Sequence, residues 1–270
     1  MARLMAHHLG AAVATAAATA RCEARMALRG RALWLAAVPV TLLGLLVSVT
    51  PLTGGMPARL TAGEAASSLV LLLPIGVGVA FADRFRRSRG TGIAELLAAT
   101  PLSTGGWLLG TFAGALAVAL VPLAVLTTVL AVLVAVRTGD PAGLVWTPLA
   151  VAAVPLPGCL WAAALSATLG LLLPVPASRV LVVPLWLWAT VWNFTLLWVP
   201  TPTGTLLAPS GEYPAAAWFG VHPPWAGAGQ VAGLSPGPGG TPAALLWLGC
   251  TLAAVAVLLL CSRLILVWKR

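Results

Sequence analysis

The sequence predicts an all-α, polytopic membrane protein with about six transmembrane helices in a single transmembrane domain of residues 1–270. The first observation is composition, because 60% of the residues are hydrophobic and only 8% are charged. Soluble domains carry about 25% charged residues. A soluble fold would therefore lack the side chains to cover its surface, and we expect the bilayer to be the solvent. The second observation is the spacing of the charges.

Charged residues divide the chain into apolar stretches long enough to cross a bilayer, since about 20 residues at a rise of ~1.5 Å span its core. The predicted spans are 33–49, 65–82, 107–136, 146–173, 180–199 and 243–267. The fourth span contains Pro155 and Pro157, which remove helix hydrogen bonds. It is therefore expected to be kinked, with a re-entrant loop as the alternative.

The basic residues predict the orientation of the spans. With both termini and the connection between the second and third spans in the cytoplasm, all 15 Lys and Arg except Arg59 and Arg137 lie inside. Such a bias sets membrane topology and brings basic side chains to anionic lipid heads. Arginine in preference to lysine, with much Ala, Gly and Pro, is typical of GC-rich bacterial genomes. We therefore expect a multi-pass protein of a bacterial plasma membrane.

The N-terminal residues 1–31 predict a cytoplasmic helix lying along the membrane surface. Arg21, Arg25 and Arg29 follow one another at helical spacing in an alanine-rich stretch, which suits contact with lipid heads. The alternative is a signal peptide, but its hydrophobic region would consist mostly of Ala and Thr.

Residues 200–242 are rich in Pro and Gly and contain no Lys or Arg, which predicts an extracytoplasmic loop. Trp218, Phe219 and Trp225 suggest short helices dipping into the outer interface. A plain mobile loop is the alternative.

Several classes of function are excluded by residues that the chain lacks. Lys269 is the only lysine, so the chain has no Walker-A loop to hold ATP phosphates. The four cysteines form no CxxC and the three histidines are scattered, which argues against a zinc site or a disulfide framework. The sequence shows no basic face interleaved with exposed aromatic residues, so it does not predict nucleic-acid binding. We expect no cofactor and no metal on this chain.

The fifth predicted span offers candidate residues for a transport pathway. Trp188, Trp192, Asn193 and Thr195 place aromatic and polar side chains within it. The tryptophans either face lipid or a neighbouring helix, or form an aromatic wall for a substrate. The Asn193–Thr195 glycosylation sequon lies within the span and is taken as fortuitous.

The one dense patch of charge begins at Asp83 and opens a segment of residues 83–104 between the second and third spans. Apolar positions spaced i, i+3, i+4 and i+7 follow it and predict a short amphipathic helix that begins at Gly92 and stops at Pro101. These positions are Ile93, Leu96, Leu97 and Thr100. A helix tied at both ends to spans can transmit a push from a soluble partner, or it can simply anchor a loop at the interface.

This segment resembles the signature segment of ABC-2 type permeases, the membrane subunits of ATP-binding-cassette exporters. The matching residues are Arg89, Gly90, Thr91, Glu95, Leu96, Leu97, Thr100, Pro101, Leu102, Ser103, Leu108, Leu109 and Gly110. The resemblance implies a separate ATP-binding-cassette ATPase subunit that carries ATP and Mg. It also implies a second permease subunit, either an identical copy or a paralogue.

The resemblance further implies that the segment couples the permease to its ATPase. The implied coupling residues are Arg84, Arg86, Arg87, Arg89, Gly90, Thr91, Ile93, Glu95, Leu96, Leu97, Thr100 and Pro101. Glu95 and the arginines would make polar contacts, and Ile93, Leu96 and Leu97 would dock into an apolar groove or onto the permease. Apolar spans favour lipophilic or amphipathic cargo, such as a drug, an antibiotic or a lipid. The alternatives are a non-transporting scaffold or assembly protein, or an intramembrane enzyme, for which the predicted spans offer no Asp, Glu or His.

Overall fold

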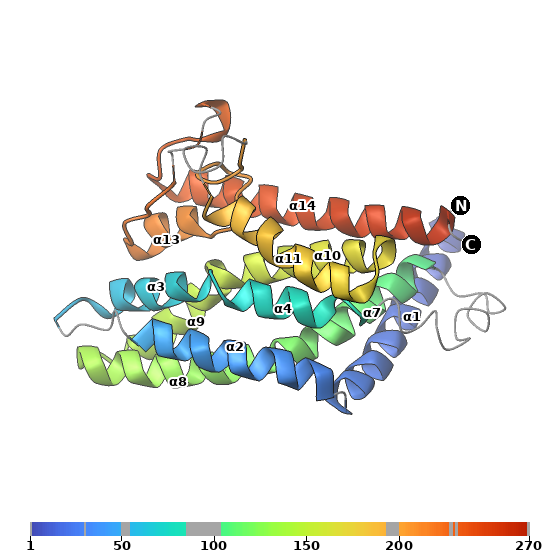
Figure 1. Cartoon of the computed structure of the whole chain (residues 1–270), viewed down its shortest axis with the longest axis horizontal. Coiled ribbons are helices and arrows are strands. Elements are labelled where there is room, and N and C mark those ends of the chain that lie inside the picture. The colour runs from blue at the N-terminus through green and yellow to red at the C-terminus, as the bar shows by residue number, and fades with distance from the viewer. Residues whose placement is uncertain are drawn as a thin grey trace.

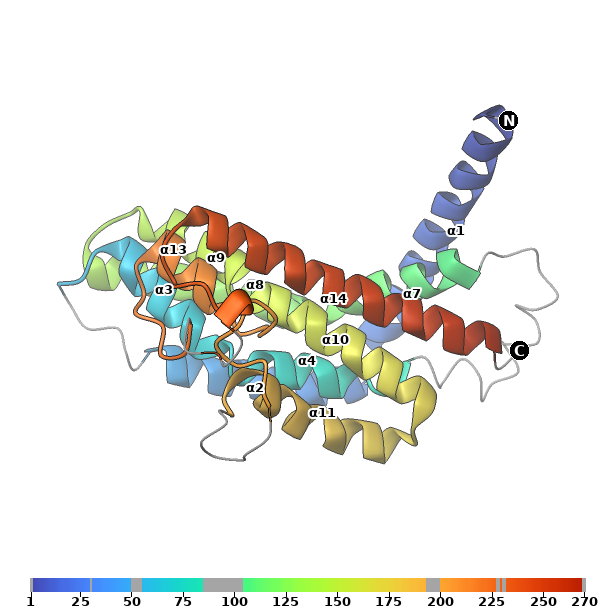
Figure 2. The ribbon, with the colours of Figure 1, turned by 90° about the horizontal axis from the view of Figure 1, so that it is seen from above.

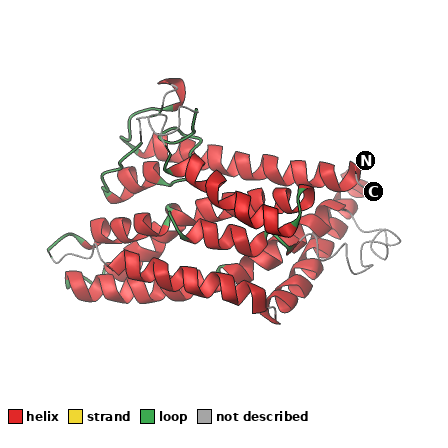
Figure 3. Ribbon diagram, in the orientation of Figure 1, coloured by secondary structure: helices red, strands yellow, loops and turns green. Residues whose placement is uncertain are grey.

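The computed structural model describes residues 2–29, 31–49, 55–84, 104–192, 200–226, 229 and 232–268. Within these ranges the chain folds into helices and turns and no strand (Figure 3), which confirms the predicted all-α class. Most helices run along one long axis as a bundle (Figure 1). The beginning of the first helix and the end of the last one lie at the same end of the bundle (Figures 1 and 2).

Most of the helices follow the apolar stretches of the sequence, apart from the first, whose 28 residues include four arginines and one glutamate. The helices are α1 (Ala2–Arg29), α2 (Arg31–Val49), α3 (Ala58–Leu69), α4 (Leu73–Phe81), α7 (Thr104–Ala119), α8 (Val121–Thr138), α9 (Gly143–Ala153), α10 (Pro155–Leu172), α11 (Val175–Thr190), α13 (Glu212–Phe219) and α14 (Thr241–Trp268), with a 3-10 turn η1 (Ala232–Leu234).

Three helical stretches of the described chain are long and apolar enough to cross a membrane: Thr104–Thr138, Gly143–Leu172 and Thr241–Trp268. The pair α3 and α4, bent by 41°, makes a fourth if it counts as one span. The stretches Val38–Val49 and Val175–Thr190 are apolar but shorter. The chain is therefore consistent with a multi-pass membrane protein, with three or four candidate spans among the described residues.

Prolines follow the breaks in three of these stretches, and the break at Leu120 within Thr104–Thr138 lies two residues before Pro122. The α9–α10 stretch breaks at Val154, directly before Pro155, and the α3–α4 pair breaks two residues before Pro74. Proline supplies no N–H to the helix ladder, so helices bend or break just before it. A methyl group added at Gly158 would lie 3.5 Å from Pro74 Cγ, so the α3–α4 and α9–α10 breaks are neighbours. Gly143–Leu172 continues across its break as one candidate span, as expected for the kinked form.

Helix α11 differs from the predicted span 180–199. It begins at Val175, directly after Pro174, and ends at Thr190. The N–H groups of Val191 and Trp192 both donate to the Leu187 carbonyl, which closes the last turn. Hydropathy extends through this point, so the apolar pattern alone did not predict where the helix ends.

Residues 200–226 fold over one end of the bundle, which we call the loop end (Figure 1). The Trp247 indole of α14 donates to the Ala208 carbonyl at 2.6 Å. The Tyr213 hydroxyl donates to the carbonyls of Gly204 and Pro236 at 3.1 and 3.2 Å. These bonds tie the segment to α14 and to the loop before it. Of the three aromatic residues for which short helices were predicted, Trp218 and Phe219 lie in α13, whereas Trp225 lies in a bend outside any helix.

Candidate functional site

Opposite the loop end lies the charged end of the bundle, where the chain leaves α4 for the predicted coupling segment. Asp83 and Arg84 are each only 7% exposed. Arg84 Nη1 lies 3.7 Å from Glu23 Oε1 of α1, and Arg179 Nη2 of α11 lies 3.4 Å from Asp83 Oδ2. Buried charges persist when they are paired. The pairs fix Asp83 and Arg84, the first two residues of the predicted coupling segment, against α11 and α1.

The chain re-enters the bundle through α7, which packs along α1. A methyl group at Gly110 would lie 2.5 Å from the Ala16 carbonyl oxygen, and one at Gly114 would overlap the Ala20 carbonyl oxygen. Small residues four apart allow two helix backbones to approach closely, as glycine does in membrane helix pairs. Helix α1 therefore contacts the beginning of the predicted coupling segment through Glu23, and it contacts the helix that follows the segment through Ala16 and Ala20.

Of the predicted coupling residues, only Arg84 belongs to the described chain. The others lie outside the described residues: Arg86, Arg87, Arg89, Gly90, Thr91, Ile93, Glu95, Leu96, Leu97, Thr100 and Pro101. Their roles in binding an ATPase stay predictions.

Two of the four predicted pathway residues, Asn193 and Thr195, also lie outside the described residues. Trp188 and Trp192 lie at the end of α11, where the loop contacts them. The Trp188 indole donates to the Pro200 carbonyl at 3.2 Å, and the Thr203 hydroxyl donates to the Trp192 carbonyl at 2.7 Å. The polar groups of both residues bind the loop segment, and a role in transport stays a prediction.

Helix α1 carries a basic groove of about 350 Å³ on its exposed side. Arg21, Arg25 and Arg29 line it together with Ala18, Cys22 and Met26. Ala27, in contrast, is fully buried against the bundle. The helix thus has one packed face and one basic face, as a helix at a membrane surface would need.

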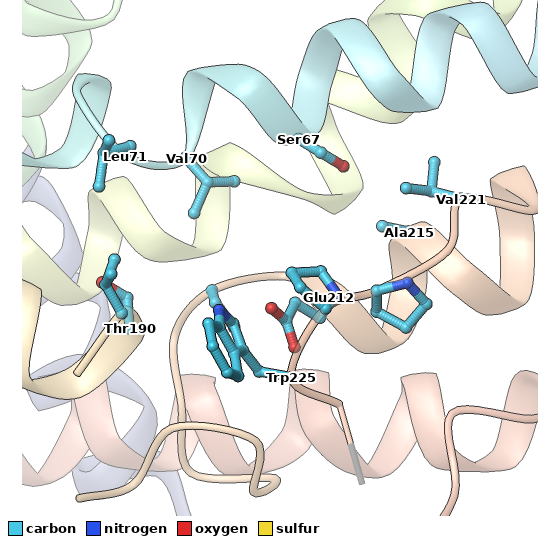
Figure 4. A pocket seen from close by; sticks show the side chains of 12 residues that line it. Ser67, Val70, Leu71, Thr190, Glu212, Ala215, Val221 and Trp225 are labelled. Atoms are coloured by element: carbon cyan, nitrogen blue, oxygen red, sulfur yellow. The ribbon is translucent and has the colours of Figure 1, made fainter. Parts of the chain in front are cut away.

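A cavity at the loop end was not predicted from the sequence. It has a volume of about 260 Å³ and lies between the α3–α4 break, the end of α11, and α13 with its following loop (Figure 4). Glu212, Ser67 and Thr190 supply polar groups, and Trp225 forms part of the wall. Because the lining comes from four separate segments, no local motif marks it.

Glu212 is the one acidic residue that lines this cavity, and it is held without a cation among the described residues. The backbone N–H groups of Trp225 and Ala226 donate to its carboxylate. Burial outweighs these bonds and raises the pKa of Glu212 from its ordinary value of 4.5 to about 7. The sequence did hold a weak sign of this site, an isolated acidic residue in a segment without Lys or Arg.

Comparison with known proteins adds no family to this description: no protein-family model matches the chain, and no curated protein sequence matches it.

Proposed function

We propose that the chain is the permease subunit of an ATP-binding-cassette exporter of the ABC-2 type. The resemblance of residues 83–104 to the signature segment of that family suggests it, and the observation that carries it is the position of α1. This helix contacts the beginning of that segment through the Glu23–Arg84 pair, and it contacts the helix that follows the segment through Ala16 and Ala20 against Gly110 and Gly114. A force on the segment would therefore act on α1, α4 and α7 together.

In this proposal the protein has six spans, because α2 and α11 cross the membrane in addition to the longer helices. Both termini face the cytoplasm of a bacterial cell, and α1 lies along the inner surface of the plasma membrane. Two permease subunits pair around a pathway for a lipophilic or amphipathic substrate. A separate ATPase subunit binds ATP and Mg and presses on residues 83–104 when it closes.

The mechanism follows from the packing of the charged end. Closure of the ATPase would displace the segment, and the buried ion pairs would pass the displacement to α1 and α11. Packed helices shift between discrete arrangements rather than deform continuously. The push therefore changes the balance between inward-open and outward-open states.

Glu95→Lys tests the proposal, with Glu64→Lys of α3 as a control that makes the same charge change outside the segment. The tagged chain is purified from native membranes, its ATPase partner is identified by mass spectrometry, and export of a lipophilic fluorescent dye is measured in proteoliposomes. We expect E95K to fold and to lose ATP-driven export at least tenfold, while E64K retains it. Equal export by E95K, or dye movement by the chain without an ATPase, would contradict the proposal.

The same experiment separates the proposal from a non-transporting scaffold. A scaffold would co-purify with other membrane proteins, and dye added to the vesicles would not change any ATPase activity that accompanies it.

A further inference from the structure

The cavity at the loop end contains polar atoms whose partners the described chain does not supply. Glu212 Oε2 and Ser67 Oγ are both buried, and neither has a hydrogen-bond partner among the described residues. Buried polar atoms in folded proteins are nearly always hydrogen-bonded to protein, water or a bound molecule. Glu212 and Ser67 both line the cavity, so a bound group that donates hydrogen bonds could supply the missing partners.

The size and lining of the cavity restrict what that group is attached to. A volume of about 260 Å³ lies just under the range of about 300–1,000 Å³ typical of drug-sized ligands. Val70, Leu71, Ala215 and Val221 give the wall an apolar side. The space therefore suits a small molecule with an apolar body and one polar end.

The charge in the cavity restricts the polar end further. Figure 4 shows the Glu212 carboxylate beside the Trp225 indole, both in the cavity. A carboxylate forms strong hydrogen bonds with a cationic donor, and an aromatic face attracts organic cations. A protonated amine satisfies both groups and brings the N–H donor that Glu212 Oε2 lacks.

We propose that this cavity binds a small primary ammonium compound. Its –NH₃⁺ group donates to Glu212 Oε2, and its apolar part packs against Val70 and Val221. The inference does not depend on the exporter proposal, since it concerns residues of the loop end alone.

The titration of Glu212 gives the site a second property. With a pKa of about 7, Glu212 is ionised mainly above neutral pH, and an ammonium ligand binds its ionised form. The other charged or titratable side chains of the elements packed around the cavity are Arg59, Glu64, Arg179, Tyr213, His222, Cys250, Cys261 and Arg263. Arg59 is occupied elsewhere, since its Nε donates to the Trp218 carbonyl at 2.5 Å and its guanidinium lies over the Trp146 ring.

Calorimetry on the purified full chain in detergent micelles tests the proposal with three probes of similar shape. Benzylamine carries the cation and its N–H donors, benzyl alcohol lacks the charge, and benzyltrimethylammonium lacks the donors. At pH 8 we expect benzylamine to bind at least tenfold more tightly than either of the others. From pH 8 to pH 6 its affinity should fall about tenfold, following the ionised fraction of Glu212.

Variants assign the binding to the cavity. Glu212→Gln should abolish benzylamine binding, whereas Glu64→Gln should retain it, and His222→Gln should keep the pH dependence because histidine is the other type of side chain that titrates near neutrality. Leu71→Trp fills the cavity from its partly exposed rim and should abolish binding with Glu212 intact.

The proposal is overturned if benzyl alcohol binds as tightly as benzylamine, or if E212Q binds like the wild type. Where E212Q does not fold, the folded L71W variant decides, because wild-type affinity in that variant would place binding elsewhere.

Discussion

The two ends of the bundle hold buried acidic groups in different ways. At the charged end, Asp83 is paired with Arg179 of α11, and Arg84 with Glu23 of α1. At the loop end, Glu212 receives backbone N–H groups but no cation from the described chain. Ion pairs fix the position of a segment, because removing one partner leaves an uncompensated charge. A carboxylate held only by backbone groups keeps the ability to change its protonation or to accept a cation from outside.

The largest expected effect comes from breaking a pair at the charged end. Arg84→Met removes the guanidinium that lies 3.7 Å from Glu23, whose side chain is 13% exposed. We expect a loss of about 3–5 kcal/mol in the free energy of unfolding, as for other buried pairs that lose one partner. The measurement is a denaturant titration in mixed micelles.

Two further variants sharpen this test. The double variant with Glu23→Gln should recover part of the lost free energy of unfolding, since the carboxylate that faced Arg84 is then neutral. Arg263→Met, at an exposed arginine of α14, should change stability by less than about 0.5 kcal/mol. Equal losses in R84M and R263M would contradict the contrast between the ends.

The next effect tests the unpaired carboxylate. Between pH 4.5 and about 7 the unfolded chain ionises at Glu212 while the folded chain keeps its proton there. The unfolded state then binds fewer protons, so stability falls as pH rises through this window and is level above it. Because each pKa unit is worth about 1.4 kcal/mol, the raised pKa of Glu212 lowers the free energy of unfolding by about 3 kcal/mol above this window.

Glu212→Gln removes this penalty. We expect it to be more stable than the wild type by up to about 3 kcal/mol at pH 8 and equal to it at pH 4, as measured by unfolding in detergent. A wild-type advantage at pH 8 would mean that Glu212 has a cationic partner.

A third variant addresses the contact between α1 and α7. Gly114→Leu places side-chain atoms where the Ala20 carbonyl lies, so α1 must move away. Overpacking of this kind costs about 2 kcal/mol. Gly249→Leu on α14, where a Cβ meets nothing within 4 Å, is the matched control and should cost little. Crosslinking between introduced cysteines on α1 and α7 would report the separation, and unchanged crosslinking would argue against the contact.

The smallest expected effect concerns the closure of the loop end. Tyr213→Phe removes a hydroxyl that donates to Gly204 or Pro236. A lost hydrogen bond of this kind costs about 1 kcal/mol. Faster hydrogen exchange over residues 200–226, with unchanged exchange over α7, would locate the effect at the loop end. An equal increase in exchange over both regions would contradict this prediction.

The helices were the part most open to prediction from sequence. Apolar stretches indicate where helices form. The break before Pro155 fits the residue type, but Pro39, Pro148 and Pro184 lie inside unbroken helices, so a proline alone does not locate a break. The close contact of Gly110 and Gly114 with α1 also left a sign in the chain, two glycines four residues apart. The sequence did not predict that these glycines pack against α1, because the spacing of small residues on one helix does not identify the helix that contacts them.

The loop end was harder to predict. Its closure depends on the bond between Trp247 and Ala208, 39 residues apart, and neither residue carries a local signal for that contact. Glu212 becomes informative only when α3, α11 and the following loop surround it. Most of the coupling residues predicted from the sequence lie within 85–103, outside the described residues. The cavity around Glu212 is the candidate site that the structure describes in most detail.

The adjoining breaks of α3–α4 and α9–α10, where Pro74 lies beside Gly158, have a mechanical consequence. Each break is a point at which a helix loses a hydrogen bond and changes direction. Helix α14, in contrast, runs unbroken from Trp247, which binds Ala208 at the loop end, to Ser262, which lies 3.0 Å from Thr168 of α10. The separation of the two ends is therefore set by α14 rather than by either interrupted stretch.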